Sequence, residues 1–182
     1  MSTLVHSTRL HSPLGPITLA AQGHALTGLW FDTPPVAAAE RGSWLEDAHH
    51  PVLMQARQQL EAYFAGERKH FDLELAPQGS AFQQTVWAAL REVGFGQTAT
   101  YGQLARAIGK PRAARAVGAA VGANPLSIVI GCHRIIGSDG SLTGYAGGLT
   151  RKMALLDIEN RGLPKPTHLY RKGNPAGLSA TA

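Results

Sequence analysis

The hydrophobic periodicity of this 182-residue chain changes near residue 77, and that change restricts the possible folds more than any other feature. Before it, short runs rich in β-branched and aromatic residues lie at 3–10, 16–21 and 25–31, separated by turn residues. Such runs predict a β-meander. After it, apolar residues recur every three or four positions, which is typical of helices. The sequence therefore predicts an α+β fold, with a small sheet followed by a mainly helical part.

Two further elements complete the first part of the chain. The segment 51–67 has a helical apolar stripe and a proline suited to a first turn. Residues 71–75 alternate like one more strand, and 76–79 have the composition of a linker. We therefore predict an N-terminal α+β domain at 1–77 and a C-terminal domain at 78–163. A mobile basic tail is predicted at 164–182.

Two capping boxes and a tight turn predict a helix-turn-helix in the second part. Ser80 and Thr100 each begin a Ser/Thr-x-x-Gln motif, which satisfies free N–H groups at the start of a helix. The second of these helices ends near Gly109, and a Gly-Lys-Pro turn leads into the helical segment 112–124. Two short helices joined so closely are typical of a helix-turn-helix.

The second helix of this unit has one face of unusual composition. Its predicted core face is apolar and comprises Ala113, Ala116, Val117, Ala120 and Val121. The opposite face comprises Arg112, Arg115, Ala119 and Gly122. Arginines beside small residues fit close approach to a nucleic-acid backbone, in a minor groove, better than sequence readout with long polar side chains. Close packing against another helix of the protein is the alternative.

Charge is divided unevenly between the predicted parts. Residues 1–77 contain five Lys and Arg against eight Asp and Glu, whereas residues 78–163 contain nine against four. Residues 164–182 contain three basic residues and no acidic one. This division favours an acidic partner such as nucleic acid for the second half. A solvated basic surface would give the same count.

Cysteine usage and the N-terminal residues indicate the compartment. The chain contains one cysteine, Cys132, so it forms no internal disulfide and no multi-cysteine zinc site. The histidines lack ligand spacing, and the first residues lack the apolar region of a signal peptide. No apolar run is long enough to span a membrane. We predict a cytoplasmic protein with no membrane association, no metal and no cofactor.

The single cysteine stands in a Cys-His-Arg motif after an apolar, strand-like run at 126–130. A thiol needs a base or nearby positive charge to become a thiolate near neutral pH, and His133 and Arg134 can supply these. In an extended segment neighbouring side chains point apart, so His133 is expected to act through a bridging water. Glu159 lies on the apolar face of a helix predicted to be capped by Thr150 and could orient His133. A buried thiol beside an ordinary Glu–Arg pair is the alternative.

The residues from 80 to 160 closely resemble the O6-alkylguanine-DNA alkyltransferases, also called methylated-DNA–protein-cysteine methyltransferases. The resemblance rests on FQQTVWAALREVGFGQTATYGQLARAIGKPRAARAVGAAVGANP and on NPLSIVIGCHRIIGSDGSLTGYAGGLTRKMALLDIE. The Asn, Cys-His-Arg, Tyr-x-Gly-Gly and Glu elements follow in the family's order. It implies a ribonuclease H-like N-terminal domain and a winged-helix-like DNA-binding domain. It makes a nucleophilic cysteine the preferred interpretation.

The resemblance also implies a role for each candidate residue. Cys132 would accept the alkyl group, His133 would be the base that acts through water, and Glu159 would orient it. Asn124 would order the turn and the thiol, and Tyr101 would rotate a phosphate and favour protonation of the leaving guanine. The implied DNA contacts are Arg115 as an intercalating finger, with Arg112, Ala116, Ala119, Gly122 and Arg134. The implied pocket residues are Gly131, Ile135, Tyr145, Ala146, Gly147 and Gly148.

Two positions depart from the family pattern. Gly131 replaces the proline that usually precedes the reactive cysteine, which predicts an altered pocket breadth and thiol position. Ala146 replaces a hydroxyl residue of some relatives, so the backbone N–H groups of Ile135 and Ala146 are the predicted donors to the guanine oxygen. The zinc-binding cysteines of some relatives are absent.

The implied activity is repair of duplex DNA by irreversible, single-turnover transfer of an alkyl group from O6-alkylguanine to Cys132. O4-alkylthymine is a second candidate substrate. Flipping of the damaged base is required, because a buried thiol cannot reach into a stacked duplex. The partner is therefore double-stranded DNA with alkylated bases, bound by a monomer, with cooperative binding left open. The alternatives are a non-catalytic sensor or regulator that binds alkylated DNA, and a cysteine hydrolase.

Overall fold

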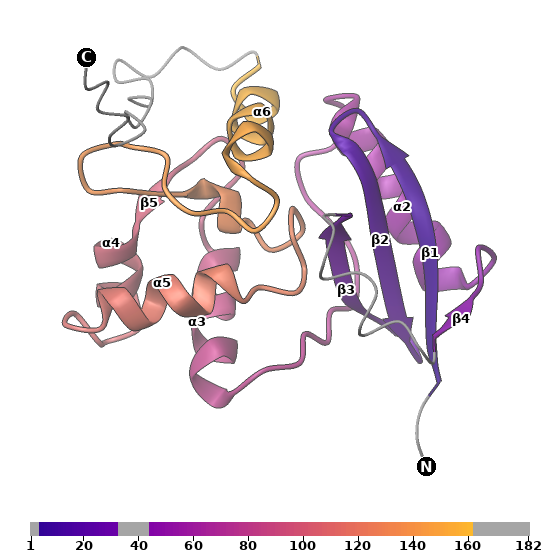
Figure 1. Ribbon diagram of the computed structural model, residues 1–182, viewed down its shortest axis with the longest axis horizontal. Coiled ribbons are helices and arrows are strands. Elements are labelled where there is room, and N and C mark those ends of the chain that lie inside the picture. Colours follow the sequence, from indigo (N-terminus) through magenta and orange to yellow (C-terminus); the bar gives the residue numbers. More distant parts are fainter. Residues whose placement is uncertain (1–3, 33–43, 162–182) are drawn as a thin grey trace, which may run out of the picture.

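The structure is a computed structural model that describes residues 4–32 and 44–161. The predicted tail at 164–182 lies outside the described residues. The described chain forms a sheet-and-helix part and a mainly helical part, side by side (Figure 1).

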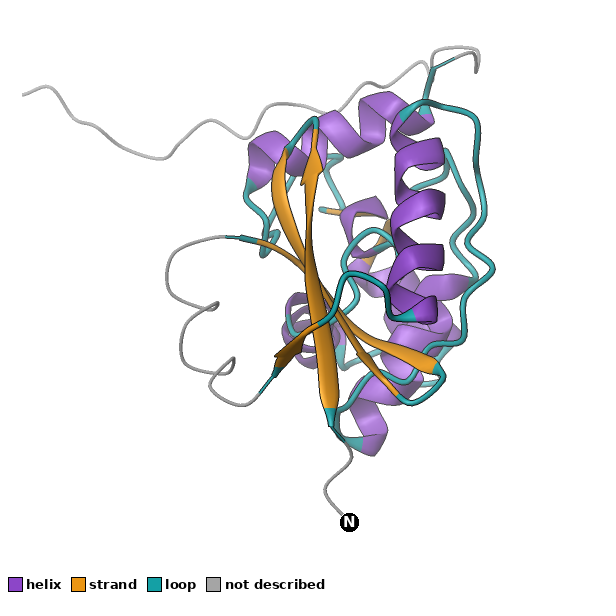
Figure 2. Ribbon diagram, turned by 90° about the vertical axis from the view of Figure 1, so that its right-hand side faces the viewer, coloured by secondary structure: helices purple, strands orange, loops and turns teal. Residues whose placement is uncertain are grey.

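A four-stranded sheet forms the first part. Strands β1 (Val5–Ser12), β2 (Gly15–Gln22) and β3 (Ala25–Phe31) pair antiparallel in sequence, which confirms the predicted meander. Strand β4 (Leu45–Glu46) pairs parallel to β1 at the other edge, giving the order β3-β2-β1-β4. The sequence analysis did not predict β4, because a two-residue strand carries no periodicity. Figure 2 shows the strong twist of the longer strands.

Helix α2 (Pro51–Phe64) lies along one face of this sheet and contacts β1, β2 and β3 (Figures 1 and 2). The helix ends at Phe64, before the predicted end at residue 67. Gly66, two residues after Phe64, has a φ of 80°, which is incompatible with a continuing helix. The predicted strand at 71–75 is reduced to one bridge between Leu75 and Leu26. Its alternation therefore reflects side chains packed against the core rather than a strand of the sheet.

The predicted helix-turn-helix is confirmed. Helix α3 (Ala81–Arg91) precedes it, strand β5 (Ala99–Thr100) leads into helix α4 (Tyr101–Ala107), and helix α5 (Ala114–Gly122) follows the turn (Figure 1). Both predicted capping boxes are complete, with the serine or threonine and the glutamine each bonding the other's backbone N–H. On α5 the core face is narrower than predicted, because Ala116 is exposed and Val117, Ala120 and Val121 are buried.

The chain then passes through the short helix η1 (Cys132–Arg134) and strand β6 (Ile135–Ile136) to helix α6 (Leu149–Glu159). Two predictions here are wrong. The run 126–130 forms one β-bridge, from Leu126 to Leu29, and is otherwise a turn instead of a strand, in which the fully buried Ile128 has a φ of 71°. Helix α6 begins two residues earlier than a Thr150 cap requires, since Gly148 precedes it with a φ of 87° and no side chain caps it.

One hydrophobic core runs through both parts of the molecule. Arg151 on α6 joins them at the surface, because its guanidinium donates to the Leu14 carbonyl and lies 4.8 Å over the Phe31 ring. Trp87 on α3 is buried and donates to the Ala120 carbonyl, which fixes α3 against α5. In the part of the chain that the structure describes, no helix is long and apolar enough to cross a membrane.

Candidate active site

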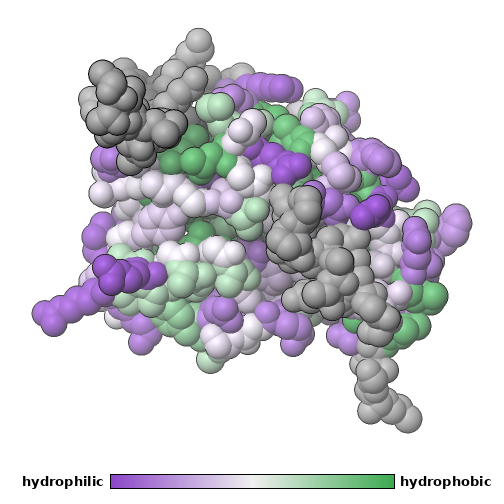
Figure 3. All heavy atoms as spheres, viewed as in Figure 1, coloured by the Kyte–Doolittle hydropathy of each residue, from purple (hydrophilic) through white to green (hydrophobic). Residues whose placement is uncertain are grey.

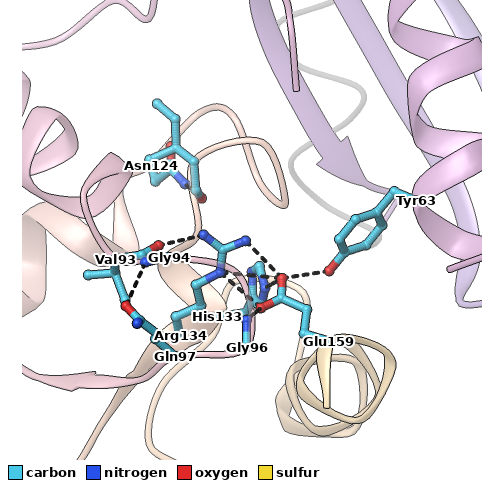
Figure 4. Close-up of polar contacts among 10 residues, drawn as sticks. Tyr63, Val93, Gly94, Gly96, Gln97, Asn124, His133, Arg134 and Glu159 are labelled. Carbon is cyan, nitrogen blue, oxygen red and sulfur yellow. Dashed lines mark hydrogen bonds and ion pairs between the residues drawn. The ribbon is translucent and has the colours of Figure 1, made fainter. Parts of the chain in front are cut away.

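The carboxylate of Glu159 is the centre of a buried hydrogen-bond network (Figure 4). Its Oε1 accepts from His133 Nε2 at 2.7 Å, from Arg134 Nη2 at 2.9 Å and from the Tyr63 hydroxyl at 2.8 Å. Its Oε2 accepts from Arg134 Nε at 3.0 Å and from the Gly96 backbone N–H at 3.0 Å. Burial alone would raise the pKa of Glu159, but the hydrogen bonds from His133 and Arg134, together with electrostatic attraction, outweigh it and lower the pKa to about 2. The carboxylate is therefore charged and held from several directions.

His133 is fully buried, and its two ring nitrogens have different surroundings. Nε2 faces Glu159, which makes it the protonated nitrogen of the neutral ring. Among the described residues, none offers a hydrogen-bond partner to Nδ1. Burial lowers the pKa of His133, and the neighbouring Glu159 opposes this only in part. The ring is therefore neutral near pH 7, with Nδ1 able to accept a proton.

Cys132 begins η1, so the segment is not extended as the sequence analysis assumed. Gly131 occupies a tight turn in which the Cys132 N–H donates to the Ile130 carbonyl at 2.7 Å. The thiol is 5% exposed, and burial raises its pKa, while the Asn124 amide and the Lys152 ammonium oppose the shift. The free protein therefore holds a protonated thiol at neutral pH, and its activation depends on a base.

Asn124 connects the end of α5 to the turn that carries Cys132. Its side-chain NH2 donates to the Ile130 carbonyl at 2.9 Å, and its oxygen accepts from the Leu126 N–H at 3.0 Å. These bonds close the turn in which Ile128 adopts a left-handed backbone conformation. A β-branched residue rarely adopts that conformation and does so only where its surroundings impose it. The Asn124 amide thus holds a strained turn beside the thiol.

A cavity of about 260 Å³ opens in front of the thiol. It lies between α4, α5 and the loop before α6, and its lining is formed mostly by small and apolar side chains. The lining residues are Tyr101, Gly118, Val121, Gly122, Asn124, Cys132, Gly144, Tyr145 and Ala146. The predicted Tyr101, Tyr145, Ala146 and Asn124 therefore surround Cys132. The sequence analysis did not assign Gly118, Val121, Gly122 and Gly144 to this pocket.

Four residues predicted for the pocket have other positions. Gly131, Ile135, Gly147 and Gly148 do not line this cavity. A Cβ placed on Gly131 would lie 2.8 Å from Arg134 Cδ, so its missing side chain makes room for Arg134 rather than for a substrate. The Ile135 N–H already donates to the Cys132 carbonyl, which corrects its assignment as a donor to guanine.

The predicted DNA contacts divide into two groups. Arg112, Arg115, Ala116, Ala119 and Gly122 are exposed along α5 and the turn before it. In Figure 3 the surface over α5 consists mainly of weakly hydrophobic residues bordered by hydrophilic ones. Arg134 is different: it is 7% exposed and donates to Glu159 and, at 2.6 Å, to the Val93 carbonyl. The structure corrects its assignment to the DNA surface, because its guanidinium is used inside the protein.

Two buried residues were missed by the sequence analysis. Lys152 is fully buried, and its ammonium donates to the Ile135 and Thr143 carbonyls, which holds the loop 135–144 against α6. Burial lowers its pKa to about 8. Its spacing with Leu155, Leu156 and Glu159 on one helix face could have revealed it. Tyr63 comes from the other part of the molecule, and no sequence signal joins it to Glu159.

Within residues 4–32 and 44–161, no group of three or more His, Cys, Asp or Glu side chains is placed to hold a metal ion.

Comparison with known proteins agrees with this geometry. Residues 5–77 match the family model described as the ribonuclease-like domain of 6-O-methylguanine DNA methyltransferase, and residues 81–161 match the one described as its DNA binding domain. Together with a buried cysteine at the base of a cavity beside a helix-turn-helix, these matches define a class, the DNA alkyltransferases. The chain belongs to the 6-O-methylguanine DNA methyltransferase family.

Individual relatives support this over most of the chain. A methylated-DNA–protein-cysteine methyltransferase of Mycobacterium tuberculosis is 45% identical over 92% of this chain and 99% of its own length. One from Methanosarcina acetivorans is 48% identical over 81% of this chain and 94% of its own. The crystal structure of Mycobacterium tuberculosis OGT in complex with DNA has a TM-score of 0.78 at 47% identity and covers 86% of this chain and 93% of that one.

Proposed function

We propose that this protein repairs duplex DNA by moving an alkyl group from O6 of guanine to Cys132, once per molecule. The observation that carries the proposal is the His133 ring, whose Nε2 is held by Glu159 while Nδ1 has no partner among the described residues. The free Nδ1 of this ring can act as a base toward the buried thiol of the adjacent Cys132. The named relatives are methylated-DNA–protein-cysteine methyltransferases, which supports the same chemistry.

The reaction is a displacement at the alkyl carbon. His133 Nδ1 takes the thiol proton, through a water molecule, and Glu159 stabilises the imidazolium that forms. The thiolate sulfur attacks the carbon, a C–S bond forms, and the C–O bond to guanine breaks. A proton delivered to the departing guanine makes it a neutral leaving group, and Tyr101 at the cavity wall is the proposed source. The thioether product has no good leaving group, so the thiol is not regenerated.

The DNA must present its damaged base outside the stack, because Cys132 lies at the base of the cavity. We propose that α5 enters the minor groove, with Ala116, Ala119 and Gly122 allowing close approach of the backbone. Arg115 would fill the space that the flipped base leaves. These residues are exposed, and Gly118, Val121 and Gly122 of the same helix line the cavity, which supports this arrangement.

Several related assignments stay predictions. The division into domains at 1–77 and 78–163 agrees with the extent of the two family models. Action on O4-alkylthymine, binding as a monomer and a cytoplasmic location rest on the sequence arguments. No residue is proposed to hold a cofactor, because the transfer needs only the thiol, the base and the proton donor.

The decisive experiment is to incubate the protein with duplex DNA containing O6-methylguanine and to determine the mass of the peptide that contains Cys132. We expect one added methylene per folded molecule. The Cys132→Ala variant should bind the same DNA and acquire no mass. An unmodified peptide from well-folded wild-type protein would refute the proposal and favour a non-catalytic DNA-binding protein. Repeated turnover on an ester or peptide would favour a cysteine hydrolase.

A further inference from the structure

We propose that Tyr63, in the N-terminal part of the molecule, is a positioning residue for alkyl transfer: its hydroxyl holds the oxygen of Glu159 that binds His133. This inference rests on the proposed function and adds a residue from outside the DNA-binding part to the same site. It assigns to helix α2 a part in the chemistry as well as in the fold.

The geometry singles out one atom. The Tyr63 hydroxyl donates to Glu159 Oε1 at 2.8 Å, and His133 Nε2 lies 2.7 Å from that same oxygen (Figure 4). The two residues are 96 positions apart in sequence, and they meet because α2 ends where α6 ends. A carboxylate oxygen that accepts from both groups cannot turn away from one without weakening its bond to the other.

The Tyr63 ring is fixed before it reaches the carboxylate. It is fully buried and packs against Phe64 and Phe71 of the same part of the chain, and edge-on against Phe95 of the other part at 6.2 Å between ring centres. A ring held on three sides presents its hydroxyl in one direction. The hydroxyl is thus a fixed donor, comparable to the outer groups that orient ligands in metal sites.

The hydroxyl also stays protonated throughout the useful pH range. Burial and the neighbouring Glu159 raise the pKa of Tyr63 above its ordinary value. The other titratable or charged groups around His133 and Glu159 are Arg134, Lys152, Cys132 and Tyr145. Among these groups Tyr63 is a neutral donor. Its hydrogen bond stabilises the negative charge of Glu159, and the hydroxyl itself does not titrate in this range.

The hydrogen bond from Tyr63 to Glu159 also affects the basicity and the orientation of His133. With the Tyr63 hydroxyl removed, Glu159 Oε1 keeps more negative charge for His133, and the imidazolium form becomes more favourable. The pKa of His133 therefore rises, and as the pH falls His133 becomes protonated, and unable to act as a base, at a higher pH than in the wild type. At the same time, the His133 ring is less well oriented. Both effects concern the chemical step and leave the DNA surface on α5 untouched.

The test is the Tyr63→Phe variant, which removes one oxygen atom and keeps the ring. Transfer is followed by intact mass under single-turnover conditions, on methylated duplex DNA and on free O6-benzylguanine, from pH 5 to pH 9 (about the range over which histidine titrates). We expect the final amplitude to stay at one alkyl group per molecule. The rate should fall by about three- to tenfold on both substrates, as the loss of one buried hydrogen bond implies. The acid limb of the rate profile should move to higher pH.

The matched control is Gln59→Leu, one turn earlier on the same helix. Gln59 is buried and bonds both the N–H and the carbonyl of Asp72, but has no bond to Glu159. It should lower the melting temperature without changing the rate or its pH profile. Replacing Tyr63 by 3-fluorotyrosine, a stronger donor of the same shape, should move the acid limb to lower pH, which provides a second measurement if Tyr63→Phe folds poorly.

The outcomes separate the two proposals. If wild-type protein transfers no alkyl group, the proposed function fails. If wild-type protein transfers normally and Tyr63→Phe has the same rate and pH profile, only the role of Tyr63 fails. The role also fails if Gln59→Leu alters the pH profile as Tyr63→Phe does, because the effect would then come from the fold of α2.

Discussion

The two sides of Cys132 are built in opposite ways. Behind the thiol, His133, Arg134 and Glu159 are buried and every oxygen of the carboxylate is occupied by donors. In front of it, a cavity of about 260 Å³ is bordered by glycines and by α5, on which Arg115, Ala116 and Ala119 are exposed. Low dielectric and fixed donors suit the activation of a thiol, whereas an open, small-residue surface suits the approach of a large substrate.

The contrast also separates stability from recognition. The buried charges of Arg134 and Glu159 are costly to leave unpaired. The rear network, formed by His133, Arg134 and Glu159, is therefore expected to tolerate little change. The front surface makes few contacts inside the protein, so changes there should affect the substrate more than the fold. Four predictions test this difference, beginning with the largest effect.

Glu159→Ala should be the most damaging change, because it leaves Arg134 and His133 buried without their partner. We expect a loss of about 3–5 kcal/mol in the free energy of unfolding and a transfer rate lower by about a hundredfold. Chemical denaturation and single-turnover kinetics measure the two effects. Glu61→Ala is the control, since Glu61 pairs with Arg57 on the surface of α2 and should cost less than about 0.5 kcal/mol. A similar loss for both variants would contradict the proposed importance of burial.

Acid should weaken the rear network before it affects the front surface. The folded pKa of Glu159, about 2, lies below its ordinary value of 4.5. A carboxyl group with a lowered folded pKa stabilises the protein fully above its ordinary pKa and loses that contribution as pH falls through the folded value. The free energy of unfolding should therefore decrease between about pH 4.5 and pH 2, and Glu159→Gln should reduce this dependence. Parallel pH curves for wild type and variant would show that other carboxyl groups are responsible.

Gly118→Leu should alter the substrate range more than the stability. A Cβ at Gly118 would lie 3.6 Å from the Tyr101 ring, in ordinary contact, and a longer side chain would extend into the cavity. We expect transfer from O6-benzylguanine to slow by about tenfold or more, as for a steric change in a hydrophobic pocket, with a smaller effect on methyl transfer. Gly118→Ala should leave both rates nearly unchanged. Equal slowing of both substrates by Gly118→Leu would place the benzyl group elsewhere.

Arg115→Ala should have the smallest effect, limited to one substrate. Transfer from duplex DNA should slow by about tenfold, while transfer from free O6-benzylguanine should hardly change, because the free base needs no flipping. The ratio of the two rates is the measurement. Arg106→Ala, at an exposed arginine of α4, is the control for loss of positive charge alone. Equal slowing on both substrates would exclude the finger role.

Local sequence signals predicted much of the fold. The meander, both capping boxes and the helix-turn-helix depend on contacts within a few residues, and the sequence analysis placed them. It failed at 126–130, where apolar residues resembled a strand but form a turn closed by Asn124. Periodicity alone does not distinguish a buried strand from a buried turn, because both are apolar throughout.

Some residues of the candidate site were identified from the sequence, whereas others were revealed only by the tertiary structure. By resemblance, the sequence identified Cys132, His133 and Glu159, and the apolar helix face around Glu159 indicated a carboxylate in need of a partner. Only the tertiary structure showed that Arg134 turns inward to Glu159, that Gly131 makes room for that guanidinium, and that Tyr63 completes the network. The Arg134 and Tyr63 contacts with Glu159 join residues that are 25 and 96 positions apart, and the Tyr63 contact also depends on how the two parts of the molecule pack together. No local pattern of residues encodes such geometry.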